Sequence, residues 1–400
     1  MLDSFFRSIR PALATALAGL LLACGGNDPG GIGSGGTGAA PSISLGSIRG
    51  FGSVIVNGVR FDESRAVIQD DDGEPFGIGR LRIGMVVEVR GSADRSAATG
   101  TATRIKVLAD VFGPAQSVDA AANSLVAMGI TVKPSAETVF EGVNSLAELQ
   151  AGDMLEISGF LDRATGLLAA TRIEKELPFV TGVTIKSKGV VGIVNPVSRT
   201  FTVSALTIDY SHAQLGNLGA GVTAPVAGSV VKVTGSRLPV GNVWQADAVQ
   251  GVQAADTTGV AIGYVEGQIS EYVSPSNFEI EGLKVNASAA IFANGTSVDL
   301  AGGVKVLAVG PLLAGILQAS TVDIRQRDQR AGIEFEISGS ITDFVSAANF
   351  KVRNTLINAS DPAVRYSHGT AATLANGRKV EIHGRIQGSV VKATEVSFDD

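Results

Sequence analysis

The segment GMVVEVRG at residues 84–91 decides the fold expected for this chain. Apolar and polar side chains alternate between its two glycines, which is typical of a strand that buries one face. The flanking glycines predict a tight turn at each end. The same frame returns as GDMLEISG (152–159), GSVVKVTG (228–235), GVKVLAVG (303–310) and GRKVEIHG (377–384).

Two further sequence patterns recur together with each frame. The frames begin 68, 76, 75 and 74 residues apart. A hairpin-like pair of apolar stretches precedes each frame, and a short strand that begins with alanine follows it. Because solenoid repeats are shorter, about 20 to 50 residues, this period predicts an array of small domains. The hairpins begin at Val54, Leu125, Phe201, Phe278 and Phe350, and the closing strands at Ala102, Ala170, Ala246, Ala319 and Ala393.

We therefore expect an all-β protein made of five tandem domains, called repeats 1 to 5. The composition agrees, because 50 glycines and 18% charged residues suit short strands joined by turns. After residue 24 no long run has the apolar spacing of a helix. The expected boundaries are 45–111 for repeat 1, 112–180 for repeat 2, 188–253 for repeat 3, 263–325 for repeat 4 and 333–400 for repeat 5.

Repeat 2 displays the order of elements best. Three expected strands precede Ser145-LAELQA-Gly152, and two follow it. This segment predicts a short helix, because Ser145 can cap it, Glu148 can complete a capping box and Gly152 can end it. Three strands, a short helix and two strands form the OB-fold, a five-stranded barrel. A simpler small β-barrel or a sandwich predicts nearly the same pattern, and the corresponding loop of repeat 1 shows no convincing helix.

Short linkers separate the later repeats, at 178–187, 253–262 and 326–332. A repeat of about 65 residues lies close to the lower limit at which one hydrophobic core is stable alone. We therefore expect neighbouring repeats to pack against one another and to stabilise one another.

The N-terminus reads as a cleavable export signal over residues 1–24. Arg7 and Arg10 provide a basic start, and the apolar run 12–22 is too short to span a bilayer comfortably. A glycine-rich tether is expected from 25 to 44. These features predict a protein that is sent to the cell envelope.

The tetrapeptide Leu21-Leu22-Ala23-Cys24 resembles the bacterial lipobox, in which the cysteine receives a diacylglycerol. The resemblance implies lipid attachment at Cys24, which is the only cysteine in the chain. Gly25 stands at the sorting position of that family, and it implies the outer membrane. An ordinary signal-peptide cleavage site is the alternative.

The frame G-x-V-x-V-x-G, the F-x-V hairpin and the closing A-x-x-I resemble a bacterial domain-of-unknown-function family, number 5666, found in tandem in envelope lipoproteins. The resemblance covers nearly all of residues 45–400, and repeat 4 departs most, with Leu307 and Ala308 where other copies carry charge. It implies a fold and a location in the cell envelope, but no known activity.

Catalytic, cofactor and metal residues are not expected. The three histidines, His212, His368 and His383, do not cluster along the sequence, whereas a zinc or catalytic site needs convergent ligands. The acidic run Asp70-Asp71-Asp72 lacks the spacing of a calcium loop. We expect a solvated acidic turn there, with weak Ca²⁺ binding as the alternative.

Nucleic acid is not an expected partner, since 32 basic residues face 38 acidic ones and no basic stripe is interleaved with aromatics. Carbohydrate could stack on an exposed aromatic ring of one barrel, although most of these rings are expected to pack within the barrels. The candidates are Trp244, Tyr210, Tyr264, Tyr272 and Tyr366.

The leading expectation is therefore a non-enzymatic, membrane-anchored envelope lipoprotein that acts as a tandem-domain spacer or interaction scaffold for a protein or glycan partner. The alternative is a lipoprotein that binds a small ligand or saccharide in one OB-like barrel.

Overall fold

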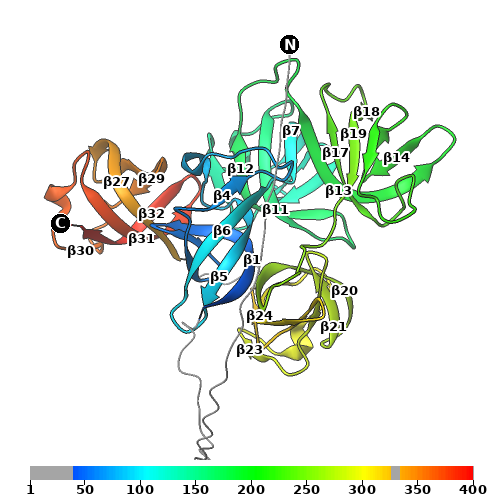
Figure 1. The fold of residues 1–400 in the computed structure, drawn as a ribbon. Coiled ribbons are helices and arrows are strands. Elements are labelled where there is room, and N and C mark those ends of the chain that lie inside the picture. The colour runs from blue at the N-terminus through cyan, green and yellow to red at the C-terminus, as the bar shows by residue number, and fades with distance from the viewer. Residues whose placement is uncertain (1–38, 326–333, 400) are drawn as a thin grey trace, which may run out of the picture. The chain divides into compact units, whose positions relative to one another are not determined.

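The computed structural model describes residues 39–325 and 334–399, and this part of the chain is all-β with small barrel-like sheets (Figure 1). Its helical content consists of single 3-10 turns. The export signal 1–24 with Cys24, and most of the expected tether, lie outside the described residues. Residues 39–44, which we expected to belong to the tether, are instead part of the first strand.

The strands of repeats 1 and 2 follow the same order, with one more short strand than the sequence predicts. Repeat 1 contains β1 (Ala39–Phe51), β2 (Val54–Val56), β3 (Val59–Asp62), β4 (Val67–Gln69), η1 (Ile78–Arg80), β5 (Val86–Asp94) and β6 (Thr99–Leu108). Repeat 2 contains β7 (Val111–Asp119), β8 (Ser124–Ala127), β9 (Ile130–Lys133), β10 (Val139–Glu141), η2 (Leu146–Glu148), β11 (Met154–Leu161) and β12 (Leu167–Lys175).

Repeats 3, 4 and 5 repeat this order, and the last strand of repeats 3 and 4 is broken in two. Repeat 3 contains β13 (Ile185–Asn195), β14 (Thr200–Val203), β15 (Leu206–Asp209), β16 (Gln214–Gly216), β17 (Val230–Gly235), β18 (Val243–Gln245) and β19 (Ala248–Gly251). Repeat 4 contains β20 (Ile262–Ser274), β21 (Asn277–Ile280), β22 (Leu283–Asn286), β23 (Ile291–Ala293), η3 (Ser297–Asp299), β24 (Lys305–Leu313), β25 (Ile316–Gln318) and β26 (Thr321–Ile324). Repeat 5 contains β27 (Glu334–Ser346), β28 (Asn349–Val352), β29 (Thr355–Asn358), β30 (Arg365–Ser367), η4 (Ala371–Thr373), β31 (Lys379–Gln387) and β32 (Val390–Phe398).

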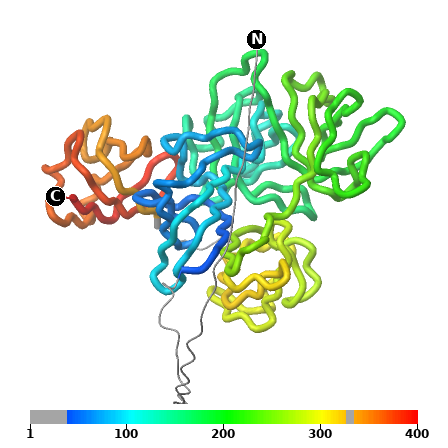
Figure 2. The backbone as a smooth tube through the Cα atoms, in the orientation of Figure 1, coloured from blue at the N-terminus to red at the C-terminus, as the bar shows by residue number. Residues whose placement is uncertain are grey.

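Strand pairing closes a ring within each of these segments. In repeat 1, β1 pairs antiparallel with β2 and β2 with β3, β3 runs parallel to β6, β6 pairs antiparallel with β5, and β5 returns to β1. The short β4 adds to β6 in parallel. Equivalent pairings occur in the four later segments. The tight hairpins that join consecutive strands can be followed along the backbone in Figure 2.

The first hairpin strand of each ring places a large apolar side chain in the interior. The residues that begin the five predicted hairpins are all at most 1% exposed: Val54, Leu125, Phe201, Phe278 and Phe350. Each pairs with a residue seven positions later on the next strand, so the register is the same in every ring. Burying such side chains contributes roughly 1.5 to 3 kcal/mol each.

The two glycines of the frame have different roles. The first one lies near the end of the turn before the strand and has a positive φ, as at Gly84 (85°) and Gly303 (79°). The second does not lie at a turn, contrary to the sequence-based prediction. It lies inside the strand, where a Cβ atom at Gly159 would come within 2.5 Å of the Ala169 carbonyl oxygen. In repeat 2 the strand register shifts at this point, between Ser158 and Gly159. In all five frames an atom of a neighbouring strand lies too close to the second glycine for a Cβ atom to fit without a shift.

The predicted helix at 145–152 is a single 3-10 turn, η2. The Ser145 side chain makes no capping hydrogen bond, and Glu148 instead accepts one from the backbone N–H of Asn144 (3.1 Å). Gly152 does not end this turn, because η2 ends at Glu148 with Leu149 as its C-cap, although the φ of Gly152 is positive (93°). Leu146 and Leu149 are buried, so their packing rather than a capping box holds this turn.

Short strand pairings also connect the rings. The strand β7 pairs with β13 of the neighbouring repeat, as expected for adjacent repeats. However, β1 pairs in parallel with β20 and, over two residues, with β27, so repeat 1 also contacts repeats that are distant in sequence. Through these few residue pairs the strands join into hydrogen-bonded sets of 19 and 13.

Candidate functional site

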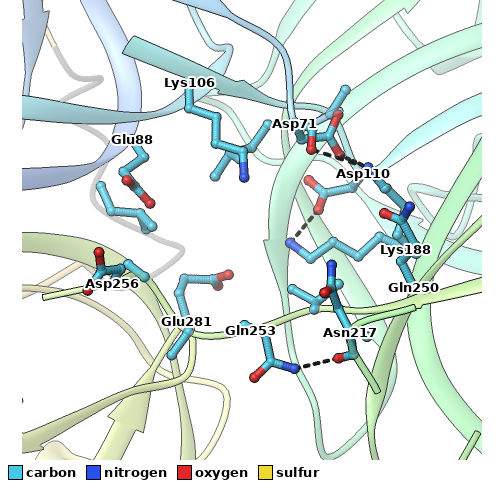
Figure 3. A pocket seen from close by; sticks show the side chains of 18 of the residues that line it. Asp71, Glu88, Lys106, Asp110, Lys188, Asn217, Gln250, Gln253, Asp256 and Glu281 are labelled. Atoms are coloured by element: carbon cyan, nitrogen blue, oxygen red, sulfur yellow. Dashed lines mark hydrogen bonds and ion pairs between the residues drawn. The ribbon is translucent and has the colours of Figure 1, made fainter. Parts of the chain in front are cut away.

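A polar cavity of about 380 Å³ is lined by residues of repeats 1, 3 and 4 and of the linker between repeats 3 and 4 (Figure 3). Its walls come from β5 and β6, from the turn between β6 and β7, from β13, β17 and β19, and from the hairpin turn between β21 and β22. Charged and amide side chains dominate these walls. Among the described residues, no aromatic side chain lines the cavity, so charge and hydrogen bonding determine what it can bind.

A buried ion pair forms one wall of the cavity. Asp110, whose side chain is 1% exposed, accepts a hydrogen bond from the Lys188 ammonium (2.8 Å) and another from the backbone N–H of Gly159 (2.9 Å). Burial alone would lower the pKa of Lys188, but the Asp110 carboxylate outweighs burial and raises it above its ordinary value. Each of the two groups therefore depends on the other for charge compensation.

The acidic turn at 70–72 contributes to the same region. The Asp71 carboxylate lies 2.9 Å from the Lys186 ammonium and 3.3 Å from that of Lys232, and Asp72 also binds Lys232 (2.5 Å). Burial raises the pKa of Asp71, but the two lysines outweigh it and the pKa is lowered. The expectation of a solvated turn is therefore wrong for Asp71: the turn docks on β13 and β17.

Glu281 faces the cavity without a partner among the described residues. The two-residue turn Glu281-Gly282 has positive φ at both positions (49° and 81°), the geometry of a type I′ hairpin turn. The residue is partly buried, and its Oε1 atom is buried with no hydrogen bond. Burial raises the pKa of Glu281 to about 7, with Asp110 adding to the rise and Lys188 opposing it. This carboxyl group can therefore change its charge near neutral pH.

Lys106 lies on another wall, on β6 opposite Glu88 in the strand register. No hydrogen bond or ion pair of Lys106 occurs within the described ranges, because Glu88 pairs with Arg90 instead (2.9 Å). Figure 3 shows the side chains of Lys106 and Glu281 entering the cavity from different walls.

A second buried charge cluster connects repeats 1 and 4. The fully buried Glu266 carboxylate binds Arg49 (2.7 Å), Arg325 (2.8 Å) and Lys305 (3.2 Å), and accepts a hydrogen bond from the Ser47 backbone N–H (3.1 Å). Burial raises its pKa, but the three cations outweigh burial and hold the pKa well below the ordinary value. The cluster is saturated, so it is suited to joining two repeats rather than to binding a ligand.

The structure brings one unexpected metal-ligand set together. Glu336, Glu381 and His383 have potential ligand atoms within 4.8 Å of one another, although no metal-binding residues were expected from the sequence. The signal lies in the pairing of β27 with β31, which sets Glu336 directly opposite His383. Arg60 engages both oxygens of Glu336, and His383 bonds Glu381 (3.1 Å). These partners already satisfy the three groups.

The strand pairing is what the repeats share, and the comparison with known families agrees with a repeated domain. Residues 112–174 and 338–397 match the domain of unknown function DUF5666. No curated protein matches the chain.

The two DUF5666 matches correspond to rings of the fold. The first extends from β7 to β12, and the second from within β27 to β32. The resemblance inferred from the glycine frames is thereby confirmed in two regions, repeats 2 and 5, which is consistent with tandem repeats of this domain family. Because the family has no described function, the match supplies an architecture and no activity.

The remaining candidate residues lie apart from one another. His212 and His368 are exposed, and His368 lies 3.5 Å from Ser397 rather than near His383. Among the aromatic candidates, Trp244, Tyr210 and Tyr264 are at most 3% exposed and pack in the cores. Tyr272 and Tyr366 are partly buried. Asp70 accepts hydrogen bonds from the backbone of its own turn, at Asp72 and Glu74 (both 2.9 Å).

Sequence reasoning missed Asp110, Lys188, Lys106 and Glu281 as members of one site. They come from three repeats, so no local motif joins them. Alternate residues of β13 point to the same face of the strand, so the sequence did place Lys186 and Lys188 on one face. This spacing was the sequence feature that could have indicated the site. Residues 39–325 and 334–399 contain no helix that could span a lipid bilayer.

Proposed function

We propose that this chain is a non-enzymatic cell-envelope lipoprotein, anchored in the outer membrane through Cys24, that serves as a tandem-domain spacer or interaction scaffold. A protein or glycan of the envelope is the proposed partner. The five rings are proposed to be five OB-like barrel domains.

The anchor is supported by the residues that precede the fold. A basic start, an apolar run and the tetrapeptide ending at Cys24 occur together, and a glycine-rich segment follows. Two or more acyl chains anchor a protein durably, since each buried CH₂ contributes about 0.8 kcal/mol. Residues 25–38 would connect that anchor to β1.

The OB-like assignment is supported by the order of strands around the ring. Numbering the five long strands of repeat 1 along the chain, the order is one, two, three, five, four and back to one, with strands three and five parallel. A closed five-stranded Greek-key barrel of this kind is the OB architecture. The recurrence of the scheme in five segments supports the count of domains.

The scaffold role rests on one observation: the rings are filled by their own side chains. Large apolar residues at most 1% exposed occupy the equivalent interior position of every ring, such as Phe201, Phe278 and Phe350. A barrel that holds a ligand needs an interior space lined by a few convergent polar groups. Interiors filled in this way leave the outer surfaces and the joints between repeats for function.

The proposal is tested by affinity capture of the tagged, lipidated protein from intact envelopes after crosslinking, with Cys24→Ala as the matched control. We expect the wild type in the membrane fraction with a reproducible crosslinked partner, and the Cys24→Ala protein in the soluble fraction. Wild-type and variant proteins that fractionate alike would contradict the anchor. No crosslinked partner, together with a reproducible saccharide hit on a glycan array, would contradict the scaffold role.

The alternative, a small ligand or saccharide inside one barrel, has less support because Trp244, Tyr210 and Tyr264 are buried in the cores. The polar cavity between the repeats is a different place for a small ligand, and its chemistry can be derived from its walls.

A further inference from the structure

The cavity of Figure 3 contains charged side chains that have no partner among the described residues. Most of its charged side chains are paired: Asp110 with Lys188, Asp71 with Lys232, and Arg90 with Glu88 and Asp256. Lys106 and Glu281 are different, because neither has a hydrogen bond or ion pair within the described residues, and the same holds for the exposed Arg104. One negative group, Glu281, and two positive groups of β6 are thus left without a partner at the cavity.

Lys106 and Glu281 do not neutralise one another. No ion pair joins Lys106 to Glu281, and they come from repeats 1 and 4. A buried carboxylate without a partner is costly, and a charged ligand that supplies its partner recovers that cost. The exposed Arg104, two residues before Lys106 on β6, adds positive charge to the same wall.

We propose that this cavity binds a free amino acid, with the ligand ammonium on Glu281 and the ligand carboxylate on Lys106 and Arg104. A carboxylate accepts hydrogen bonds from an ammonium, and charge-assisted bonds of this type are about twice as strong as neutral ones. The cavity volume of about 380 Å³ lies within the usual range of small-molecule sites, roughly 300 to 1,000 Å³. The amide side chains of Asn217, Gln250 and Gln253 line the same space and can bond polar ligand groups.

Opposite charges on separate walls select against ligands with one charge. Glu281 and Asp110 would repel a ligand that carries only a negative charge. Lys106 and Lys188 would repel a ligand that carries only a positive charge. A saccharide would leave the unpaired charges uncompensated. Binding an amino acid is a function in addition to the proposed scaffold role, and neither requires the other.

The test is isothermal titration calorimetry of the purified full chain in detergent with each of the standard amino acids. Every amino acid that binds is compared with its N-acetyl derivative, which lacks the ammonium, and its carboxamide, which lacks the carboxylate. We expect at least one amino acid to bind, and both derivatives to bind at least tenfold more weakly. Absence of binding by all amino acids, or equal binding of either derivative, overturns the proposal.

The variants Glu281→Gln and Lys106→Gln test whether these two side chains, on different walls of the cavity, bind the amino acid. Each should weaken binding at least tenfold, while Lys284→Gln, an exposed lysine of the same repeat outside the cavity, should leave it unchanged. Variant proteins that bind as tightly as the wild type overturn the proposal. Circular dichroism verifies folding, and the ligand derivatives provide the same test on the wild type if a variant fails to fold.

The pH dependence separates a direct contact from a structural effect. Glu281 is faced by Lys188 of β13, Asp110 of the β6–β7 turn and Arg163 of repeat 2, and it must be ionised to hold an ammonium. Wild-type affinity should therefore increase between pH 6 and pH 8. Lys106→Gln should retain this increase, whereas Glu281→Gln should lose it. An affinity that is independent of pH in the wild type contradicts the role of Glu281.

Discussion

Replacing Gly310 by alanine tests why the second glycine of each frame is required. A Cβ atom at this position would overlap the carbonyl oxygen of Gln318 and lie 2.8 Å from its carbonyl carbon and 2.9 Å from the Ser320 nitrogen. Carbon and oxygen need more than 3 Å of separation, so β24 and β25 must move apart by about 1 Å. The backbone hydrogen bond from Ser320 to Val309 (2.8 Å) and the neighbouring β24–β25 pairs would be strained or lost.

The expected loss follows from these contacts. Two or three hydrogen bonds with a net value of about 1 kcal/mol each, together with residual steric strain, give a destabilisation of about 2 to 4 kcal/mol. Urea unfolding followed by far-UV circular dichroism should show a midpoint lower by about 1 M, for a urea dependence of about 2 to 3 kcal/mol/M.

Gly302 provides the matched control in the same repeat. A Cβ atom at Gly302 meets nothing within 4 Å, and its φ is not in the positive range. Gly302→Ala should therefore be neutral or stabilising by up to about 1 kcal/mol, because alanine restricts the unfolded chain. Equal unfolding midpoints for Gly310→Ala and Gly302→Ala would refute the close-approach argument.

Four other outcomes are expected. Phe350→Ala should cost about 3 to 5 kcal/mol in denaturant unfolding, since the ring is fully buried; a loss below 1 kcal/mol would mean that repeat 5 has no independent packed interior. Asp110→Asn should cost about 3 to 5 kcal/mol by leaving the Lys188 ammonium uncompensated, and wild-type stability in the same assay would contradict this. Because the pKa of Glu281 is raised to about 7, the folded state binds more protons than the unfolded state between about pH 4.5 and 7, so unfolding free energy should fall as pH rises through this window; Glu281→Gln should remove that slope, and an unchanged slope would assign it to another group. Calcium titration should give a flat calorimetric trace at the acidic turn, because Asp71 and Asp72 already bind Lys186 and Lys232; a saturable signal lost in Asp70→Asn would show a site there.

The glycine frames predicted the repeated framed strand and the hairpins before it, because alternation and turn residues are local properties. The same reasoning misplaced the second glycine at a turn. What excludes a side chain at Gly310 is the Gln318 carbonyl of the partner strand, and no pattern within the frame reports on that strand. The predicted helix at 145–152 contracted to one turn for a similar reason, since buried Leu146 and Leu149 determine its conformation.

The site was less accessible to sequence reasoning than the fold. The acidic run at 70–72 was visible as charge, but only its docking on Lys186 and Lys232 shows that Asp71 is partly buried and paired. Glu281 looked like an ordinary hairpin-turn residue, and Lys106 like an ordinary lysine on a strand.

The sequence by itself determined the all-β class, the order of elements, the period of the repeat and the similarity to DUF5666, since these depend on residues close together in the chain. Only the tertiary structure decided that the first strands pair between repeats, as β1 does with β20, and that repeats 1, 3 and 4 enclose one charged cavity. The physical reason is that burial and charge compensation depend on groups far apart in sequence. Asp110 and Lys188 are 78 residues apart, and only the folded chain brings them to 2.8 Å.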